Sequence, residues 1–163
     1  MGEKQISLRH EGGMRFVART TSGHDVVVDN ASGNTGPRPT ELVLAAIAGC
    51  TAMDVVDILA KKRQVVDRYS VEVRGTQREK APNVFTDITV THLVEGNVDT
   101  EAVRRSIELS ATRYCTVSAQ VAGGPARISH CYTIHRPGGD GVPRSEESAE
   151  VVVTGPMRDV LAD

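Results

Sequence analysis

Three cysteines in this 163-residue sequence carry side chains that could act as nucleophiles or redox groups: Cys50, Cys115 and Cys131. None of them belongs to a C-x-x-C pair. In a reducing cytosol they are not expected to form structural disulfides. Each cysteine is therefore a buried thiol, a metal ligand or a reactive thiol, and the surrounding sequence has to separate these interpretations.

Cys50 follows Gly49 in the middle of a predicted helix. A glycine inside a helix costs about 1 kcal/mol relative to alanine, so it usually serves close packing or access. The missing side chain either permits a tight helix crossing or lets a small substrate reach the sulfur. A thiol attacks as its thiolate, which an aliphatic pocket disfavours, so a reactive Cys50 needs a neighbouring cation. The N-terminal candidates for this cation are Arg15, Arg19 and Arg38.

Glu41 could orient such an arginine through a charge-assisted contact. It precedes Cys50 by about two and a half helical turns, which places the two side chains on opposite sides of an ideal helix. Their cooperation would need a bridging arginine or a bent helix start. The alternative interpretation of Glu41 is an ordinary acidic residue in the first turn of the helix.

The other two cysteines lie in different predicted elements. Cys115 marks the end of a second helix, where fraying would let a thiol move onto an oxidised partner, as a resolving cysteine must. The alternative is a buried thiol at a helix end. Cys131 follows His130 in a strand, and because neighbours in a strand face opposite sides, the two cannot share one site. We expect Cys131 to be structural.

Other chemistries find little support in the sequence. The five histidines are scattered, without the spacing of a metal site: His10, His24, His92, His130 and His135. A metal site of Cys50, Cys115 and a histidine has no such spacing in its favour. G-x-S-x-G, Walker and G-x-G-x-x-G motifs do not occur. We therefore expect no metal and no bound cofactor.

Charge and composition argue against nucleic acid and membranes as partners. Nineteen basic and 21 acidic side chains leave a net charge of −2, with no basic block that would attract nucleic acid or an anionic membrane. Only 3% of the residues are aromatic, so stacking on bases is not expected. No segment is expected to reach the roughly 18 apolar residues that span a bilayer. The polar stretch at residues 1–10 lacks a signal-peptide core, which predicts a cytoplasmic protein.

Hydrophobic periodicity predicts the elements that position the cysteines. Strands are expected at residues 15–19, 24–28, 69–78, 85–93 and 126–135. A long helix is expected at 39–63, with its apolar stretch 42–48 buried on all sides, and a second helix from Asp99 to Cys115. A short helical turn is expected at 117–121. This order is typical of an α+β fold with an antiparallel sheet.

Length and composition predict one domain over residues 1–136. Residues 137–148 are rich in Gly, Pro, Ser and Glu, which predicts a flexible C-terminal tail over 137–163. Within that tail, 151–154 could dock as a strand.

Two stretches around the cysteines resemble one known family. Residues 34–51, NTGPRPTELVLAAIAGCT, look like the signature of the OsmC/Ohr family of osmotically inducible and organic-hydroperoxide-resistance proteins. Residues 113–118, RYCTVS, look like its second cysteine motif. The continuation 54–64, DVVDILAKKRQ, is similar to the YhfA-like branch. The resemblance covers most of residues 5–135.

This resemblance implies an intertwined homodimer in which antiparallel sheets wrap around long central helices. It also implies a thiol-dependent peroxidase that reduces organic hydroperoxides. Cys50 matches the peroxidatic position and Cys115 the resolving one, so peroxide would form a sulfenic acid at Cys50 and then a Cys50–Cys115 disulfide. An external dithiol of the lipoyl type would reduce the disulfide, without a bound cofactor.

The activating residues of the family match less directly. The family's glutamate directly follows the proline, and in this sequence that position is Thr40, with Glu41 one place later. Arg15 is the better match for the activating arginine and Arg38 is its rival. Two alternatives to the peroxidase stay open. The chain could be a non-catalytic member of the family that binds an apolar small molecule in the pocket of the cysteines, or a redox sensor whose surface changes when its cysteines are slowly oxidised.

Overall fold

The computed structural model describes residues 3–138 and 144–155. Its contacts divide the chain into two compact units, Met1–Val43 and Leu44–Asp163. Among its described residues, the first unit contributes only Ala18 to the buried hydrophobic residues, so nearly all of the core lies in the second unit. The single domain over residues 1–136 stays a prediction.

The first unit is a three-stranded antiparallel sheet in the order β1-β2-β3. Its strands are β1 (Ile6–Gly12), β2 (Arg15–Thr20) and β3 (Asp25–Val28), and the last two form the predicted hairpin. The loop that follows β3 is organised by Asp29, whose carboxylate accepts hydrogen bonds from the amide (3.1 Å) and the hydroxyl (2.6 Å) of Thr35. The predicted loop is therefore present and has its own internal hydrogen bonds.

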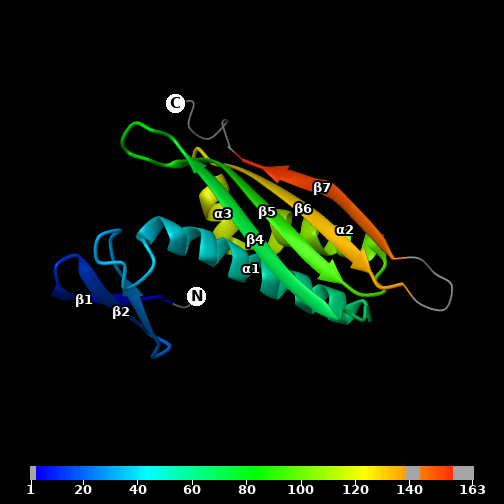
Figure 1. The fold of residues 1–163 in the computed structure, drawn as a ribbon, viewed down its shortest axis with the longest axis horizontal. Helices are drawn as coiled ribbons and strands as arrows, with labels where there is room; N and C mark the ends of the chain where they lie inside the picture. The colour runs from blue at the N-terminus through cyan, green and yellow to red at the C-terminus, as the bar shows by residue number, and fades with distance from the viewer. Residues whose placement is uncertain (1–2, 139–143, 156–163) are drawn as a thin grey trace. The chain divides into compact units, whose positions relative to one another are not determined.

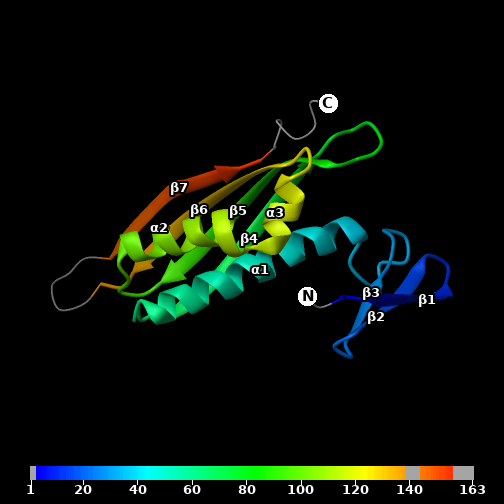
Figure 2. The same ribbon diagram turned by 180° about the vertical axis from the view of Figure 1, so that it is seen from behind.

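The second unit is a helical layer on one face of a four-stranded sheet (Figures 1 and 2). Helix α1 (Pro39–Lys61) begins in the first unit and continues into this one. The elements after it are β4 (Arg68–Gln77), β5 (Phe85–Glu95), α2 (Thr100–Leu109), a π-helical turn (Ser110–Tyr114), α3 (Thr116–Ala122), β6 (Arg127–Arg136) and β7 (Ser145–Thr154). The α+β class is thus confirmed.

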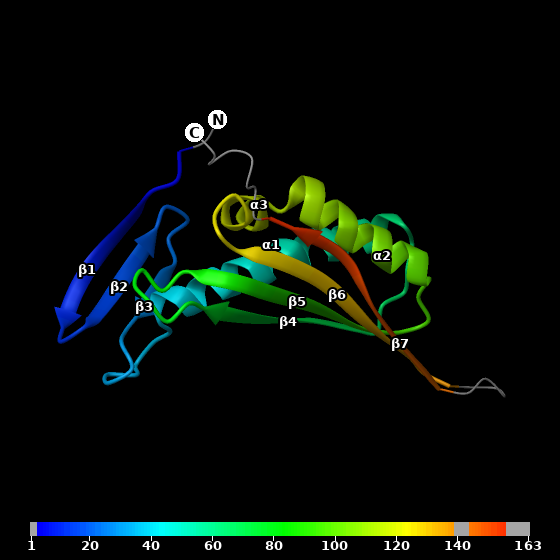
Figure 3. The same cartoon turned by 90° about the horizontal axis from the view of Figure 1, so that it is seen from above.

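The expectation of a wholly antiparallel sheet was wrong at one pairing. The strands lie in the order β4-β5-β6-β7 (Figure 3), and β5 and β6 run parallel. Parallel neighbours need a long crossover connection, and here α2, the π-helical turn and α3 supply it. This crossover matters for function because it brings Cys115 into the helical layer.

The core lies between the sheet and the helices. Strands β5 and β6 turn alternate residues toward the helices, and these are fully buried, whereas the intervening residues face away. Helix α2 begins at the predicted N-cap, where the Asp99 carboxylate accepts a 2.9 Å hydrogen bond from the Ala102 amide. The main cluster consists of Val55, Leu59, Val94, Val98, Ala102, Val103, Ile107, Tyr132 and Ile134.

Strand β7 corrects the expectation of a flexible tail from residue 137. Residues 145–154 pair antiparallel with β6 and extend the sheet. Polar composition concealed this strand, since an edge strand tolerates charged residues. Glu147 ties it to the core, because its carboxylate accepts hydrogen bonds from Tyr132 (2.9 Å), Thr100 (2.7 Å) and Arg136 (3.1 Å). The rest of the predicted tail, 139–143 and 156–163, lies outside the described residues.

Helix α1 differs from two expectations. It has the length and apolar composition of a membrane span, although only 22% of its most apolar 18-residue window is buried. Its buried residues form one stripe, Ile47, Thr51, Val55 and Leu59, and Ala45 and Ala46 are exposed, so the stretch 42–48 is not buried on all sides. The sequence predicted no apolar segment of membrane-spanning length here. Many apolar residues of this helix are small, and they raise its mean hydropathy without forming a long run of large apolar side chains. A wide apolar surface of α1 is therefore left uncovered by its own chain.

Two fully buried histidines lie on the helix-facing side of the sheet. His92 of β5 and His130 of β6 stack with their ring centroids 6.1 Å apart, and Tyr69 of β4 is hydrogen-bonded to Nδ1 of His92 at 2.7 Å. Among the described residues, neither ring nitrogen of His130 has a hydrogen-bond partner. Burial lowers the pKa of His92 to about 3 and that of His130 to about 4.

The two buried histidines predict that the folded protein loses stability at acidic pH. In the unfolded chain both imidazoles take up protons near pH 6.5, whereas the folded protein resists protonation down to about pH 4. Their contribution to stability is therefore complete above about pH 6.5 and is lost as the pH falls toward the folded pKa values. In His130→Leu, the loss of unfolding free energy between pH 7.5 and 4.5 should be smaller by about 2–3 kcal/mol. Urea unfolding at both pH values measures this, with exposed His24→Leu as the control. Equal losses in the wild type and His130→Leu would contradict it.

Candidate thiol site

Cys50, Asp54 and Cys115 meet in the second unit. The two sulfur atoms and a carboxylate oxygen all lie within 4.8 Å of one another. Cys50 and Asp54 are four residues apart on α1, which places them on the same face of the helix. Cys115 comes from the crossover between β5 and β6. The structure thus brings together the two cysteines that the sequence singled out.

A π-helical turn delivers Cys115 to this position. The turn Ser110–Tyr114 follows α2 directly, and the Cys115 amide donates a 2.8 Å hydrogen bond to the carbonyl oxygen of Ser110, five residues earlier. At Cys115 the backbone becomes extended and the residue then caps α3. Cys115 therefore lies at a junction between two helices, in agreement with its predicted place at a helix end.

The two thiols have different surroundings. Cys50 is partly exposed, whereas Cys115 is only 2% exposed. The Cys115 sulfur accepts a hydrogen bond from the Ser118 amide (3.4 Å), and its S–H donates to the Ser118 hydroxyl (3.1 Å). Burial raises the pKa of the Cys115 thiol, and the adjacent Cys50 adds to this rise, while the bonds from Ser118 oppose it. Cys115 is therefore the protected thiol, and Cys50 is the one that meets solvent.

Gly49 has space beside it. A Cβ atom added there would meet no described atom within 4 Å beyond the neighbouring backbone of its own helix. Of the two interpretations of this glycine, a tight helix crossing within the chain is therefore wrong. Open space next to Cys50 agrees with the second interpretation, in which the absent side chain keeps the approach to the sulfur free.

Hydrogen bonds hold the two sides of the site together. The Ser110 hydroxyl donates to Oδ2 of Asp54 at 2.9 Å and lies 3.0 Å from the Thr51 hydroxyl. Because Ser110 has a single proton, Thr51 must donate to Ser110. Thr51 and Ser110 are fully buried. The sequence did not single out Asp54; its spacing of four residues from Cys50 was the signal that could have placed it in the site.

The predicted activating residues all lie in the first unit. Arg15 donates to the Thr35 hydroxyl at 2.7 Å. Glu41 accepts from both the amide (2.8 Å) and the guanidinium (2.7 Å) of Arg38, and these bonds lower the pKa of Glu41. Glu41 thus pairs with Arg38, its neighbour three residues earlier. Among the described residues, no arginine or lysine donates a hydrogen bond to either sulfur, so the catalytic roles of Arg15 and Glu41 stay predictions.

Cys131 stands apart from this cluster. It lies on the face of β6 opposite to His130, as the alternation predicted, and its backbone neighbours across the sheet are Thr91 and Glu150. Partial burial raises the pKa of its thiol, and the charge of Glu150 acts in the same direction. Its environment suits a thiol kept in its neutral form.

Comparisons with known proteins decide the family. Residues 32–130 match the family described as OsmC-like protein. The chain belongs to the OsmC-like family. This OsmC-like chain is 39% identical over 131 residues to Protein YhfA of Escherichia coli K12, which covers 80% of the chain and 97% of its relative. The predicted family and branch are therefore confirmed.

Solved structures share the fold of this OsmC-like chain. A hypothetical protein from Aquifex aeolicus is 28% identical and superposes with a TM-score of 0.76, covering 84% of this chain and 99% of that one. An organic hydroperoxide resistance protein OsmC from Legionella pneumophila is 11% identical, with a TM-score of 0.60 over 82% of this chain and 97% of the other. The second likeness concerns the fold alone.

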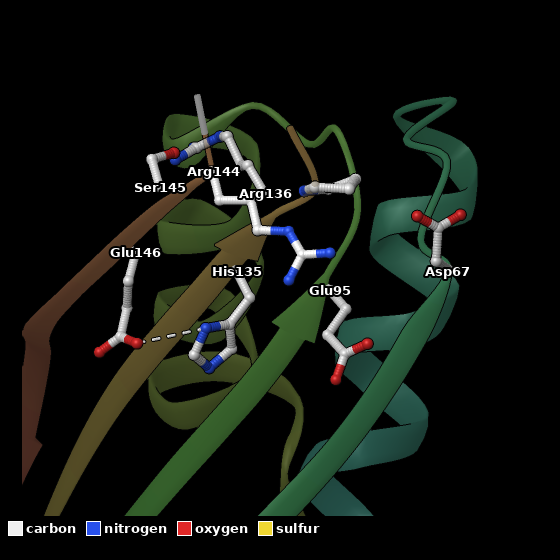
Figure 4. A pocket seen from close by; sticks show the side chains of 8 residues that line it. Asp67, Glu95, His135, Arg136, Arg144, Ser145 and Glu146 are labelled. Atoms are coloured by element: carbon white, nitrogen blue, oxygen red, sulfur yellow. Dashed lines mark ion pairs between the residues drawn. The ribbon is translucent and has the colours of Figure 1, made fainter. Parts of the chain in front are cut away.

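A concave region away from the thiol cluster is lined by charged side chains. It lies where β5 and β6 end and β7 begins, and Figure 4 shows acidic and basic side chains around it. His135 pairs with Glu146 at 3.3 Å, and Arg136 pairs with Glu147 at 3.1 Å. The described side chains of this pocket largely neutralise each other, and no cysteine lines it. The thiol cluster is the better candidate for chemistry.

The hydrogen bonds of Thr51 and Ser110 predict energetic coupling across the site. Ser110→Ala leaves the buried Thr51 hydroxyl and the partly buried Asp54 carboxylate without their partner and should lower the unfolding free energy by about 1–3 kcal/mol. Thr51→Val should cost less in the Ser110→Ala background than in the wild type, with a coupling energy of about 0.5–1.5 kcal/mol. Urea unfolding of the four proteins measures it. Ser106→Ala is the control, since that hydroxyl bonds only its own helix. Additive effects of Thr51→Val and Ser110→Ala would refute the coupling.

Proposed function

We propose that this chain is a cysteine-based peroxidase that reduces organic hydroperoxides. The proposal rests on one observation: a partly exposed thiol and a buried thiol, from two separate elements, lie within 4.8 Å of each other. A disulfide requires a sulfur–sulfur distance of about 2.05 Å, so modest movement joins them. Membership of the OsmC-like family, and the resemblance of residues 34–51 to the signature that organic-hydroperoxide-resistance proteins share, support this substrate class.

The chemistry follows from the unequal exposure of the thiols. The Cys50 thiolate attacks the terminal oxygen of the hydroperoxide, the O–O bond breaks, and the alkoxide takes up a proton and leaves as an alcohol. Cys50 is then a sulfenic acid. The Cys115 thiol attacks its sulfur, releases water and closes the disulfide. Two electrons pass from the thiols to the peroxide, and an external dithiol of the lipoyl type restores both thiols.

The same proposal includes an intertwined homodimer. Helix α1 exposes apolar side chains that its own chain does not cover, with Met53 75% and Val56 49% exposed. A second copy would bury this surface, as in the arrangement that the family resemblance implies. We further propose that the protein works in the cytoplasm, where a dithiol reductant is available and its cysteines stay reduced.

Cysteine variants test the peroxidase. With cumene hydroperoxide and dihydrolipoamide, the wild type should turn over repeatedly, and Cys50→Ser should lose at least a hundredfold in rate. Cys115→Ala should consume about one equivalent of peroxide and then stall or over-oxidise at Cys50. Peroxide consumption and the mass of the intact protein are the measurements.

Cys131→Ser is the matched control and should be nearly silent. Loss of both thiols in the wild type without turnover would instead identify a redox sensor. Unreactive thiols would identify a protein that binds an apolar small molecule. Either result would overturn the peroxidase.

We also propose that Arg15, rather than Arg38, activates Cys50, with Glu41 orienting a guanidinium. In a chain that keeps Cys50 alone, Arg15→Gln should slow alkylation of Cys50 by iodoacetamide at pH 7 about tenfold, because an adjacent cation favours the thiolate. Arg19→Gln is the control, since Arg19 pairs with Asp25 at 2.9 Å. If Arg38→Gln alone slowed the reaction, the assignment would pass to Arg38.

A further inference from the structure

We propose that Cys50, Asp54 and Cys115 bind a zinc ion when the thiols are reduced. The inference concerns the same thiol pair as the proposed function, but it depends on coordination chemistry and not on turnover. The sequence offered no metal spacing, since it held no histidine at a suitable distance from the cysteines. The structure supplies the missing ligand as a carboxylate.

The donor atoms are close enough for one ion. All three lie within 4.8 Å of one another. Tetrahedral zinc binds thiolate sulfur at about 2.3 Å and carboxylate oxygen at about 2.1 Å, so its ligands are separated by roughly 3.5–3.8 Å. The side chains therefore need to approach by about 1 Å or less. Cys50 and Asp54 supply two ligands from one helix face, at the same spacing of four residues that other zinc sites use on a helix.

Surrounding hydrogen bonds orient these ligands. Ser110 donates to Oδ2 of Asp54, and Thr51 supports Ser110 from the other side. Oδ1 of Asp54 accepts no hydrogen bond from the described residues and is available to a metal. The Ser118 amide faces the Cys115 sulfur and would stabilise its thiolate. Hydrogen-bond partners of this kind orient metal ligands in most protein metal sites.

Charge and softness select the ion. Two thiolates and a carboxylate carry three negative charges, and no described arginine or lysine bonds either sulfur. A divalent cation would supply the positive charge that lets both thiols ionise together. Thiolates favour zinc over the harder magnesium and calcium, and the carboxylate argues against copper(I). Three protein ligands leave the fourth position of the tetrahedron to a water molecule or another small ligand.

Zinc binding and the disulfide exclude each other. In the zinc-bound state both thiolates are metal ligands, whereas in the oxidised state the two sulfurs are bonded to each other. When the zinc-bound thiolates reduce one hydroperoxide, two protons are taken up, and one disulfide, one alcohol, one water and the free zinc ion result. The ion would therefore protect the thiols from over-oxidation and leave when they are oxidised.

Cobalt(II) substitution of the reduced, metal-free protein tests the site without peroxide. Anaerobic titration should give thiolate-to-cobalt absorption in the near ultraviolet that saturates at one equivalent per chain, and zinc should displace the cobalt. Asp54→Asn should weaken zinc binding at least tenfold, measured by competition with a chromophoric chelator. Cys115→Ala should lose the intensity of thiolate-to-cobalt absorption that two sulfur ligands give.

Matched controls keep the outcome specific. Asp57→Asn changes an exposed carboxylate of the same helix, and Cys131→Ser removes the cysteine outside the cluster; both should bind zinc like the wild type. A thermal melt of each metal-free variant confirms folding. Weak zinc binding that Asp54→Asn and Cys115→Ala leave unchanged would overturn the proposed site. Turnover of peroxide without zinc binding would remove this inference and keep the peroxidase, whereas zinc binding without turnover would do the reverse.

Discussion

The contact between helix α1 and the π-helical turn is the constraint on which the thiol pair depends. An α-helix rotates by about 100° per residue, so a regular α-helical path through Ser110–Tyr114 would carry Cys115 to another direction. The extra residue of the π turn aims its sulfur at α1. Thr51, Ser110 and Asp54 then fix how α1 lies against the turn. The distance between the sulfurs therefore depends on helix geometry and on two hydrogen bonds, one buried and one partly buried.

That contact also makes the two sulfurs unequal. Cys115 is enclosed by the crossover and bonded to Ser118, while Cys50 has open space beside Gly49. In the proposed peroxidase, an incoming peroxide would therefore meet Cys50 first, and Cys115 would react only after Cys50 has become a sulfenic acid. Burial would then set the order of the two chemical steps.

The sequence predicted those parts of the fold for which local signals suffice. Asp99 is a strong N-cap, and alternation identified β5 and β6 because their inward residues are apolar. Strand β7 escaped because its place in the sheet depends on long-range bonds to Glu147, and the parallel pairing of β5 with β6 escaped because it depends on the crossover. In the site, motif resemblance identified the cysteines. Asp54 was missed because neither cysteine motif includes it, although its helical spacing places it on the same face as Cys50.

The thiol cluster of the second unit has no cationic hydrogen-bond partner among the described residues. It contains both sulfurs and a carboxylate, all of which carry or acquire negative charge, and its described residues place no guanidinium or ammonium hydrogen bond on either sulfur. The candidate guanidiniums, Arg15 and Arg38, belong to the first unit, where each already has an oxygen partner. In the proposed peroxidase, the cation that activates Cys50 would therefore come from outside the cluster. In the proposed peroxidase a guanidinium would favour attack on peroxide, whereas the proposed zinc ion would hold both thiolates as ligands until they are oxidised.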